Sequence, residues 1–261
     1  MGKRDSSETR VVPVFNALFT ADPSGCSWLP QLLALPKGRR ADARTPPRVV
    51  GSVHAKHWFP NEMELPAPVS LLKWLVRNPP SGLGKRSKSW GTRKKRLALA
   101  KRDAATCAQA LDLLSHTPVP KRAWYVLEGY TQPDVYLETD EVVVVIEGKR
   151  TESAPTRETR WMPVRHQIIR HLDCAFERSG GRQLFGFFIV SGGAAAHDTQ
   201  LPHEWRSACR ETITEHTLMG SLPHRDHAER ETIAQSFLGA TTWQSVCREL
   251  GVDWESLPDT V

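Results

Sequence analysis

The sequence predicts an α/β fold built around a mixed central sheet, and three observations support this. The stretch Val142–Gly148 carries apolar side chains on both faces up to Ile146, which is typical of a central strand covered on two sides. Further strand-like stretches are found at 123–128, 134–138 and 183–191. Between the strand at 142–148 and the strand at 183–191, the segment 162–178 has helical periodicity. Strands and helices therefore alternate as they do in α/β proteins. The expected core order is therefore helix, three strands, helix, strand.

Helices are expected on both sides of this strand-rich region. The segment 65–77 predicts an amphipathic helix, with two prolines tolerated at its entry. A longer helix is predicted from Thr92 to Ser115, and the last part of the chain predicts helices near 202–218, 226–238 and 241–250.

These patterns divide the chain into three parts. We expect an N-terminal extension at 1–61, whose first ten residues form a flexible tail. The core is expected at 62–192, with a basic helical insertion near 85–115. A helical C-terminal region is expected at 193–261.

Composition narrows the class of protein. The 261 residues carry a net charge of +6, which suits a protein that approaches a polyanion such as DNA. The five cysteines include no CxxC pair, so the spacing indicates neither a disulfide framework nor a zinc ribbon. No apolar stretch approaches the roughly 18 residues of a membrane span, so we expect a cytoplasmic protein with no membrane partner.

A candidate site lies where the valine-rich strand ends. Asp134 begins the preceding strand, and Glu147 and Lys149 share one face at the end of the next, because side chains alternate along a strand. Directly paired residues also point to the same face. A two-residue turn at Asp140–Glu141 would pair Asp134 with Glu147, and one at Thr139–Asp140 would place them diagonally. A regular three-residue loop would separate the two carboxylates. We predict one of the two-residue turns, or a bulge that restores the parity.

The chemistry of these groups predicts metal-assisted hydrolysis of a phosphodiester. Asp134 and Glu147 are hard oxygen ligands suited to Mg²⁺, with Mn²⁺ able to substitute, and the carbonyl of Gly148 can supply a third ligand. Lys149 can hold or help deprotonate the attacking water. Gly148 leaves room for close approach of the backbone.

The motif resembles that of the PD-(D/E)XK nuclease superfamily. The resemblance rests on Pro133-Asp134, on Glu147-x-Lys149 thirteen residues later and on the element order, and it covers roughly residues 62–191. It implies a restriction-endonuclease-like core and Mg²⁺-dependent cleavage of DNA, in defence, restriction or repair. In this resemblance Asp134 and Glu147 are the metal ligands and Lys149 is the catalytic lysine.

Two features of the family extend the predicted site. Members often carry another acidic residue on the first helix, a position that Glu64 or Glu62 can fill, with Glu128 as a rival. RecB-like members carry a glutamine-led motif ending in tyrosine on the helix after the lysine. Here Gln167 matches the glutamine, which makes it a further catalytic candidate, but the tyrosine is missing.

A basic segment predicts contacts with nucleic acid. Between Lys85 and Arg102 nine residues are basic and none is acidic, and a tryptophan among them can stack on a base. A solvated helix face is the alternative. The predicted contact residues are Trp90, Arg93, Lys94, Lys95, Arg96, Lys101 and Arg102. Four arginines beyond the lysine can flank the scissile phosphate or simply cover a helix: Arg157, Arg160, Arg165 and Arg170.

Other functions stay open at this point. A module that keeps the fold, binds nucleic acid or takes part in an assembly and does no chemistry is the main alternative, and an RNase is another. The sequence is compatible with a homo-oligomer and with one subunit of a larger defence or transposition complex.

Overall fold

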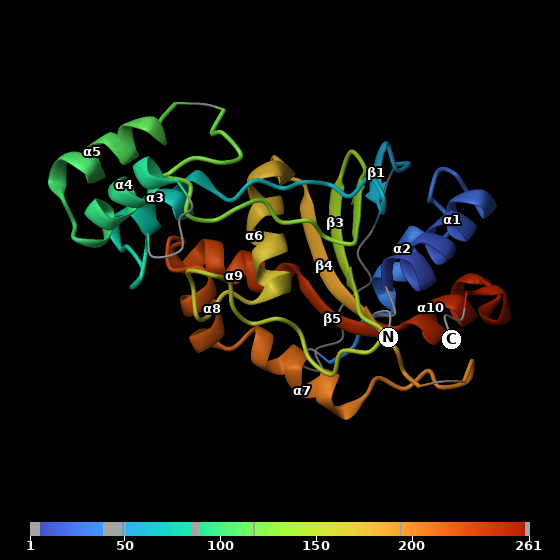
Figure 1. Ribbon diagram of the computed structural model, residues 1–261. Coiled ribbons are helices and arrows are strands. Elements are labelled where there is room, and N and C mark those ends of the chain that lie inside the picture. The colour runs from blue at the N-terminus through green and yellow to red at the C-terminus, as the bar shows by residue number, and fades with distance from the viewer. Residues whose placement is uncertain are drawn as a thin grey trace.

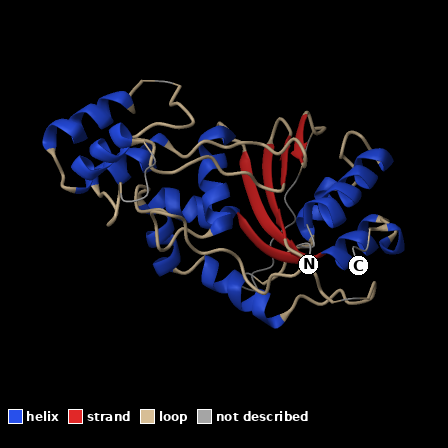
Figure 2. Ribbon diagram, in the orientation of Figure 1, coloured by secondary structure: helices blue, strands red, loops and turns tan. Residues whose placement is uncertain are grey.

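A mixed sheet forms the centre of the molecule, as the sequence predicts. The computed structural model describes residues 6–38, 49, 51–84, 89–116, 118–193 and 195–258. Within these residues the sheet has five strands in the order β1-β2-β3-β4-β5 (Figures 1 and 2). β1, β2 and β3 are antiparallel neighbours, whereas β3, β4 and β5 run parallel. Their bounds are β1 Ala55–Trp58, β2 Val135–Glu138, β3 Val142–Gly148, β4 Gln183–Val190 and β5 Phe237–Thr242.

Helices cover both faces of the sheet, which explains the apolar character of β3. Val144 and Ile146 face a core formed with α1 (Val12–Ala21), α2 (Leu29–Ala34) and α10 (Trp243–Leu250). Val143 and Val145 face a second core. The helices of that core are α6 (Gln167–Ser179), α7 (His203–Thr212), α8 (Glu215–Ser221) and α9 (His227–Ser236). All seven residues of β3 are buried because side chains of both parities meet a helical layer.

The hairpin between β2 and β3 confirms the predicted turn. Glu138 pairs with Val143, and the Thr139 amide donates to the Val142 carbonyl at 2.9 Å. The two residues left in the turn are Asp140 and Glu141. The Thr139 hydroxyl accepts hydrogen bonds from the Glu141 and Val142 amides, which stabilises this turn. Continued by one step beyond β2, the register places Asp134 opposite Glu147.

A separate helical lobe lies beside the sheet and has its own apolar core (Figure 1). It contains α3 (Val69–Arg77), α4 (Trp90–Ala100) and α5 (Ala104–Leu113). The single helix predicted from Thr92 to Ser115 is wrong, because Arg102 has a φ of +58° and breaks it. Asp103 then accepts from the Thr106 amide and begins α5 as its N-cap.

The predicted strand at 123–128 is also wrong. The backbone there forms turns, and the Arg96 side chain donates to the carbonyls of Ala123, Trp124 and Val126. These carbonyls are therefore satisfied by a guanidinium instead of a neighbouring strand. The neighbour of β2 on the side away from β3 is β1, which lies in the predicted N-terminal extension and precedes α3.

The predicted helical C-terminal region contains a strand. β5 follows α9 directly and pairs in parallel with β4, so the helices expected at 226–238 and 241–250 are separated by part of the sheet. The helix expected at 202–218 is divided into α7 and α8. The helix predicted at 162–178 begins only at Gln167, and a single 3-10 turn, η2 (Trp254–Ser256), follows α10.

The sheet core includes side chains from all three predicted parts of the chain. Phe15, Val144 and Trp243 belong to one apolar cluster. Part of the predicted N-terminal tail is structured as well, since η1 (Ser7–Val11) is a π-helical turn with a fully buried Val11; residues 1–5 lie outside the described residues. No helix in the described part of the chain is long and apolar enough to cross a membrane.

Candidate active site

Glu147 is the centre of the predicted site and is almost completely buried. It lies at the end of β3 on the face covered by α6, and only 4% of its surface is exposed. Its Oε1 accepts from Lys149 Nζ at 2.9 Å and from Gln167 Nε2 at 2.6 Å. Its Oε2 lies 3.0 Å from His171 Nε2. The structure thus brings Glu147, Lys149 and Gln167 together, as predicted.

Asp134 directly precedes β2, across the hairpin from Glu147. Its Oδ2 accepts a hydrogen bond from the Gly148 amide at 2.7 Å. This contact places the Asp134 carboxylate beside the end of β3, next to Glu147 in the strand register. The negative charge of Glu147 acts on the Asp134 carboxyl group, so the two-residue turn brings the two predicted groups close enough to interact.

The pKa values of the two carboxyl groups are shifted in opposite directions. Burial and the negative charge of Glu147 raise the pKa of Asp134 to about 8, although the Gly148 amide and Lys149 oppose this change. Burial also acts to raise the pKa of Glu147, but the hydrogen bonds and charges of His171 and Lys149 outweigh it and lower that pKa. Glu147 holds the negative charge, and Asp134 near neutral pH prefers a proton or another cation.

Gly148 is required by packing. A Cβ atom at this position would lie 2.8 Å from Trp243 and 2.9 Å from Val11, so any larger residue would clash with both. The space that we expected for a close approach is filled by the protein itself. The Gly148 carbonyl, predicted as a metal ligand, accepts a hydrogen bond from the Ser6 hydroxyl at 3.2 Å.

His171 is a member of the site that sequence reasoning missed. It lies one turn after Gln167 on α6, so both side chains face Glu147. Its Nδ1 is 2.8 Å from the Thr131 hydroxyl. Because a carboxylate can only accept, Nε2 carries the hydrogen that points to Glu147. The sequence offered one signal. His171 follows Gln167 by four residues and stands where the glutamine-led motif of the family ends in tyrosine.

The two candidates for an additional acidic ligand differ in their surroundings. Glu64 forms an ion pair with Lys121, so the preferred candidate is occupied by another partner. Glu62 contributes to the raised pKa of Asp134, which shows that its charge acts at the site. Neither residue lies on the first helix of the lobe, since both precede α3.

Glu128 belongs to a buried ion network on another face of α6. Its Oε1 accepts from Arg165 and Arg170, and Arg165 also contacts Asp173 at 2.8 Å. Asp173 in turn meets His224 and Arg225. Glu128, Arg165 and Asp173 are all buried, so this network joins α6 to its neighbouring loops. Arg157 lies outside it and pairs with Glu211.

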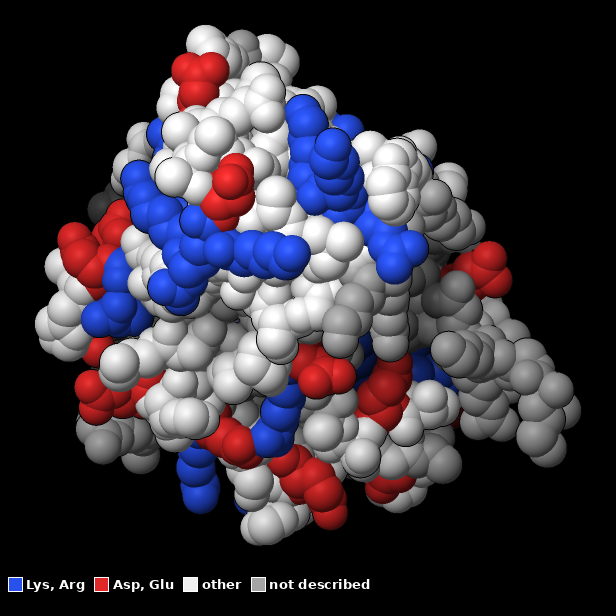
Figure 3. Space-filling view, turned by 60° about the vertical axis from the view of Figure 1, so that its left-hand side comes forward, with Lys and Arg blue, Asp and Glu red and all other residues white. Residues whose placement is uncertain are grey.

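The predicted nucleic-acid contacts divide into structural and exposed groups. The structural group contains Arg96, which donates to carbonyls of the 123–126 turn, and Lys95, whose Nζ lies over the Trp124 ring at 4.6 Å. The exposed group comprises Trp90, which is 74% exposed, and Arg93, Lys94, Lys101 and Arg102. Lys85, Arg86 and Lys88 of the basic run lie outside the described residues. Figure 3, which turns the lobe toward the viewer, shows Lys and Arg gathered on the upper part of this face, with most Asp and Glu lower or near the rim.

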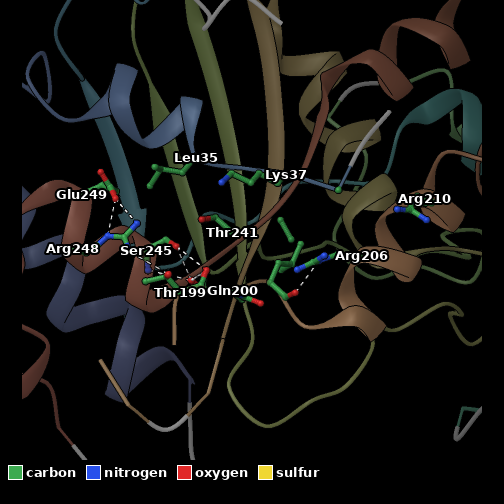
Figure 4. Close-up of a pocket in the computed structure, with 14 residues that line it drawn as sticks. Leu35, Lys37, Thr199, Gln200, Arg206, Arg210, Thr241, Ser245, Arg248 and Glu249 are labelled. Carbon is green, nitrogen blue, oxygen red and sulfur yellow. Dashed lines mark hydrogen bonds and ion pairs between the residues drawn. The ribbon is translucent and has the colours of Figure 1, made fainter. Parts of the chain in front are cut away.

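A separate cavity of about 580 Å³ lies beside β5 and α10. Figure 4 shows Arg248 paired with Glu249 at one end and Arg206 and Arg210 at the other, with Thr241 between them. None of the predicted site residues lines it.

Asp134 and Glu147 offer carboxylate oxygens, the kind of ligand that a hard divalent cation prefers, but both oxygens of Glu147 already have protein partners. Within the described residues, no three His, Cys, Asp or Glu side chains are grouped as a metal site, so protein carboxylates alone would supply two ligands. Mg²⁺ is commonly bound through one or two carboxylates and keeps several waters. Gln167 Oε1 is buried and has no hydrogen-bond partner in the described residues, and it offers a neutral oxygen beside Glu147.

Comparisons with known proteins add no assignment: no family model matches the chain, and neither the curated proteins nor the solved structures give a significant match.

Proposed function

We propose that this protein is a metal-dependent nuclease that hydrolyses phosphodiester bonds of DNA at the Asp134–Glu147–Lys149 site. The observation that carries the proposal is the pairing of two carboxylates at the end of a buried strand, one of which has its pKa raised to about 8. Strongly perturbed carboxylates of this kind cluster at functional sites. A divalent cation would take the place of the proton on Asp134.

The residues would have distinct roles. Asp134 and Glu147 would hold Mg²⁺ or Mn²⁺, which when bound acidifies a water and neutralises charge on a phosphate. Lys149 keeps its ammonium group charged beside Glu147, since the carboxylate outweighs burial and raises the pKa of the lysine. From there it can hold the attacking water or a phosphate oxygen. Gln167 and His171 fix the orientation of the Glu147 carboxylate through hydrogen bonds to both of its oxygens.

One set of observations favours a second candidate, a binding module without catalysis. Both oxygens of Glu147 already have protein partners, and the carboxylate is almost inaccessible to solvent. A cation could bind there only if Lys149, Gln167 or His171 moved. An RNA substrate is a variant of the leading proposal, because the roles given to Asp134, Glu147 and Lys149 act on the phosphate, which DNA and RNA share.

A cleavage assay separates these candidates. Plasmid, linear, single-stranded DNA and RNA substrates are incubated with the purified protein and Mg²⁺ or Mn²⁺. We expect cleavage that EDTA abolishes and that falls at least about 100-fold in Asp134→Ala, Glu147→Ala and Lys149→Ala, since removal of a group that stabilises charge in the transition state has this order of effect. Asp140→Asn, an exposed carboxylate at the other end of the hairpin, is the matched control and should keep full activity. Cleavage that persists in Glu147→Ala would contradict the site, and absence of cleavage on every substrate would favour the binding module.

A further inference from the structure

A second cavity, of about 660 Å³, lies between the helical lobe and α6. Its walls come from the loop 121–129, the loop 158–161, Thr92 and Arg96 of the lobe and Arg170 of α6. This volume falls within the roughly 300–1,000 Å³ of small-molecule sites. Neither of its neighbouring loops forms regular secondary structure, so their side chains define the cavity.

The cavity has an excess of positive charge. Five basic side chains line it, Arg96, Lys121, Arg122, Arg160 and Arg170, together with the two acids Glu128 and Glu158. Arg170 is compensated by Glu128 and Lys121 by Glu64. In the described part of the chain, no carboxylate forms an ion pair with Arg96, Arg122 or Arg160.

Repulsion between two of these cations supports the same conclusion. Burial lowers the pKa of Arg96, and the charge of Arg160 lowers it further, so the two guanidinium groups act on each other. Among the described residues, the hydrogen-bond acceptors of Arg96 are the backbone carbonyls of the 123–126 turn, which leave its charge uncompensated. An anion between the guanidinium groups would relieve the repulsion, and phosphate fits the planar donor arrangement of arginine.

Two tryptophans give the cavity an aromatic surface beside this charge. Trp124 and Trp161 both line it and are only partly buried. Arg160 lies over the Trp161 ring at 4.5 Å, so one residue pair combines a flat ring with a cation. Aromatic rings next to basic groups bind nucleotides by stacking on the base and contacting the phosphate.

The cavity also lies close to the candidate active site. Arg170 lines the cavity, and the next residue of α6, His171, contacts Glu147. The chain makes a second connection, because Glu128 and Gly129 line the cavity and Thr131 contacts His171. A ligand in the cavity would thus lie on the adjoining face of the helix that orients Glu147.

We propose that this cavity binds a single nucleotide, with its phosphate against Arg122 and Arg160 and its base against Trp124 and Trp161. The nucleotide can be free in solution or an unpaired nucleotide of a nucleic-acid strand. Binding needs no metal and no cleavage, so this inference can fail or succeed independently of the proposed nuclease activity.

The test measures binding in EDTA, where metal-dependent cleavage cannot occur. A short, fluorescently labelled, 5′-phosphorylated single-stranded oligonucleotide is titrated with the full chain, and AMP is added as a competitor. Arg122 and Arg160 are exposed, so the double variant Arg122→Gln/Arg160→Gln is expected to fold, which its unfolding temperature verifies. Arg96 is left unchanged because it holds the 123–126 turn. Arg77→Gln, an exposed arginine of the same lobe outside both the cavity and the predicted contact residues, is the matched control.

We expect the double variant to bind at least about tenfold more weakly and the control to stay within about twofold. The salt dependence should also weaken, by about 0.7 in the slope of log K against log salt for each phosphate of a single strand that the protein no longer neutralises. Trp161→Leu should weaken binding several-fold if the base stacks there, and unchanged binding in this variant would overturn the contact with the base.

The competitor identifies the source of the nucleotide. Displacement of the oligonucleotide by AMP supports a site for free nucleotides, whereas oligonucleotide binding that AMP does not affect supports an unpaired nucleotide within a strand. Two results would overturn the proposal: no binding of either probe at millimolar concentration, or oligonucleotide binding that is equal in the double variant and the wild type.

Discussion

Two groups of acids, one around Asp173 of α6 and one formed by Asp134 and Glu147, differ in how their charge is compensated. Asp173 is fully buried but meets Arg165, His224 and Arg225, whose charges and hydrogen bonds overcome the effect of burial and hold its pKa well below the usual range. Asp134 accepts a hydrogen bond from a backbone amide, and burial and the charge of Glu147 raise its pKa to about 8 although Lys149 acts in the opposite direction. Positive charges of the protein therefore compensate Asp173 fully and Asp134 only in part.

The difference separates a structural role from a functional one. A buried carboxylate surrounded by arginines needs no further partner, and it stabilises the arrangement of the elements that supply the arginines. A carboxylate beside a second carboxylate costs stability unless a proton or a metal ion joins it. Burial alone would not have distinguished the two groups, because Glu147 and Asp173 are both buried.

The largest expected effect comes from breaking the compensated group. Asp173→Ala removes the buried carboxylate that Arg165, His224 and Arg225 share and leaves Glu128 as the remaining buried acid of the network, so we expect the free energy of unfolding to fall by about 3–5 kcal/mol. Urea unfolding at neutral pH measures this change. Glu177→Gln is the control, because Glu177 also contacts Arg225 but its side chain is half exposed, so its loss should cost less than about 1 kcal/mol. A loss below about 1 kcal/mol for Asp173→Ala would refute the structural role.

The next prediction concerns the partly compensated group and its dependence on pH. Asp134 has a folded-state pKa of about 8, above the ordinary value of 3.8, so between these values the folded state binds the additional proton. Its contribution to stability therefore falls as the pH rises from about 4 to about 8. Asp134→Asn cannot ionise, and at pH 8 without divalent ions it should be more stable than wild type by on the order of 1–2 kcal/mol.

Urea unfolding between pH 5 and pH 9 in EDTA tests this prediction. The exposed carboxylate of Asp140 supplies the control, since Asp140→Asn should keep the pH dependence of the wild type. If Asp134→Asn and wild type have parallel stability curves over this range, the carboxylates of Asp134 and Glu147 are not coupled.

The parts of the fold and site that depend on local sequence could be predicted. β3 has the predicted bounds, since an uninterrupted valine run buried on both faces has few alternatives. The turn at Asp140–Glu141 was one of two predicted, and the local side chain of Thr139 selects it. These features in turn place Asp134 beside Glu147.

The features that were missed depend on contacts between distant segments. β1 contains a lysine and a histidine in four residues, and only its pairing with β2 makes it a strand. The stretch 123–128 has the apolar pattern of a strand, but three of its carbonyls accept hydrogen bonds from Arg96, which lies 27 to 30 residues earlier in the chain. Local patterns cannot supply such pairings, because tertiary contacts override β-propensity.

The choice between Glu62 and Glu64 shows the same limit at the level of one side chain. Both lie in the connection between β1 and α3, where the sequence gives no regular periodicity. Lys121, from a loop more than fifty residues away, pairs with Glu64, while Glu62 is the one whose charge reaches Asp134. No local signal distinguishes the two.

The smallest expected effect concerns the hydrogen bond that orients His171. Thr131→Val replaces the hydroxyl by a methyl group of similar size and leaves Nδ1 of a buried imidazole without its partner. Loss of one partner of a buried hydrogen bond costs about 1–3 kcal/mol, and we expect the lower end, near 1 kcal/mol, by urea unfolding. Because Nε2 still donates to Glu147, the ring should keep its place, while Nδ1 loses the hydrogen bond that restrains the other side of the ring. The ¹⁵N shifts of the imidazole report the tautomer directly.

The exposed Thr232→Val, which removes a hydroxyl bound to the Ala228 carbonyl of its own helix, is the control. It should leave the His171 shifts unchanged and should change the stability by no more than about 0.5 kcal/mol. Identical His171 shifts in Thr131→Val and wild type would mean that Glu147 alone orients the ring.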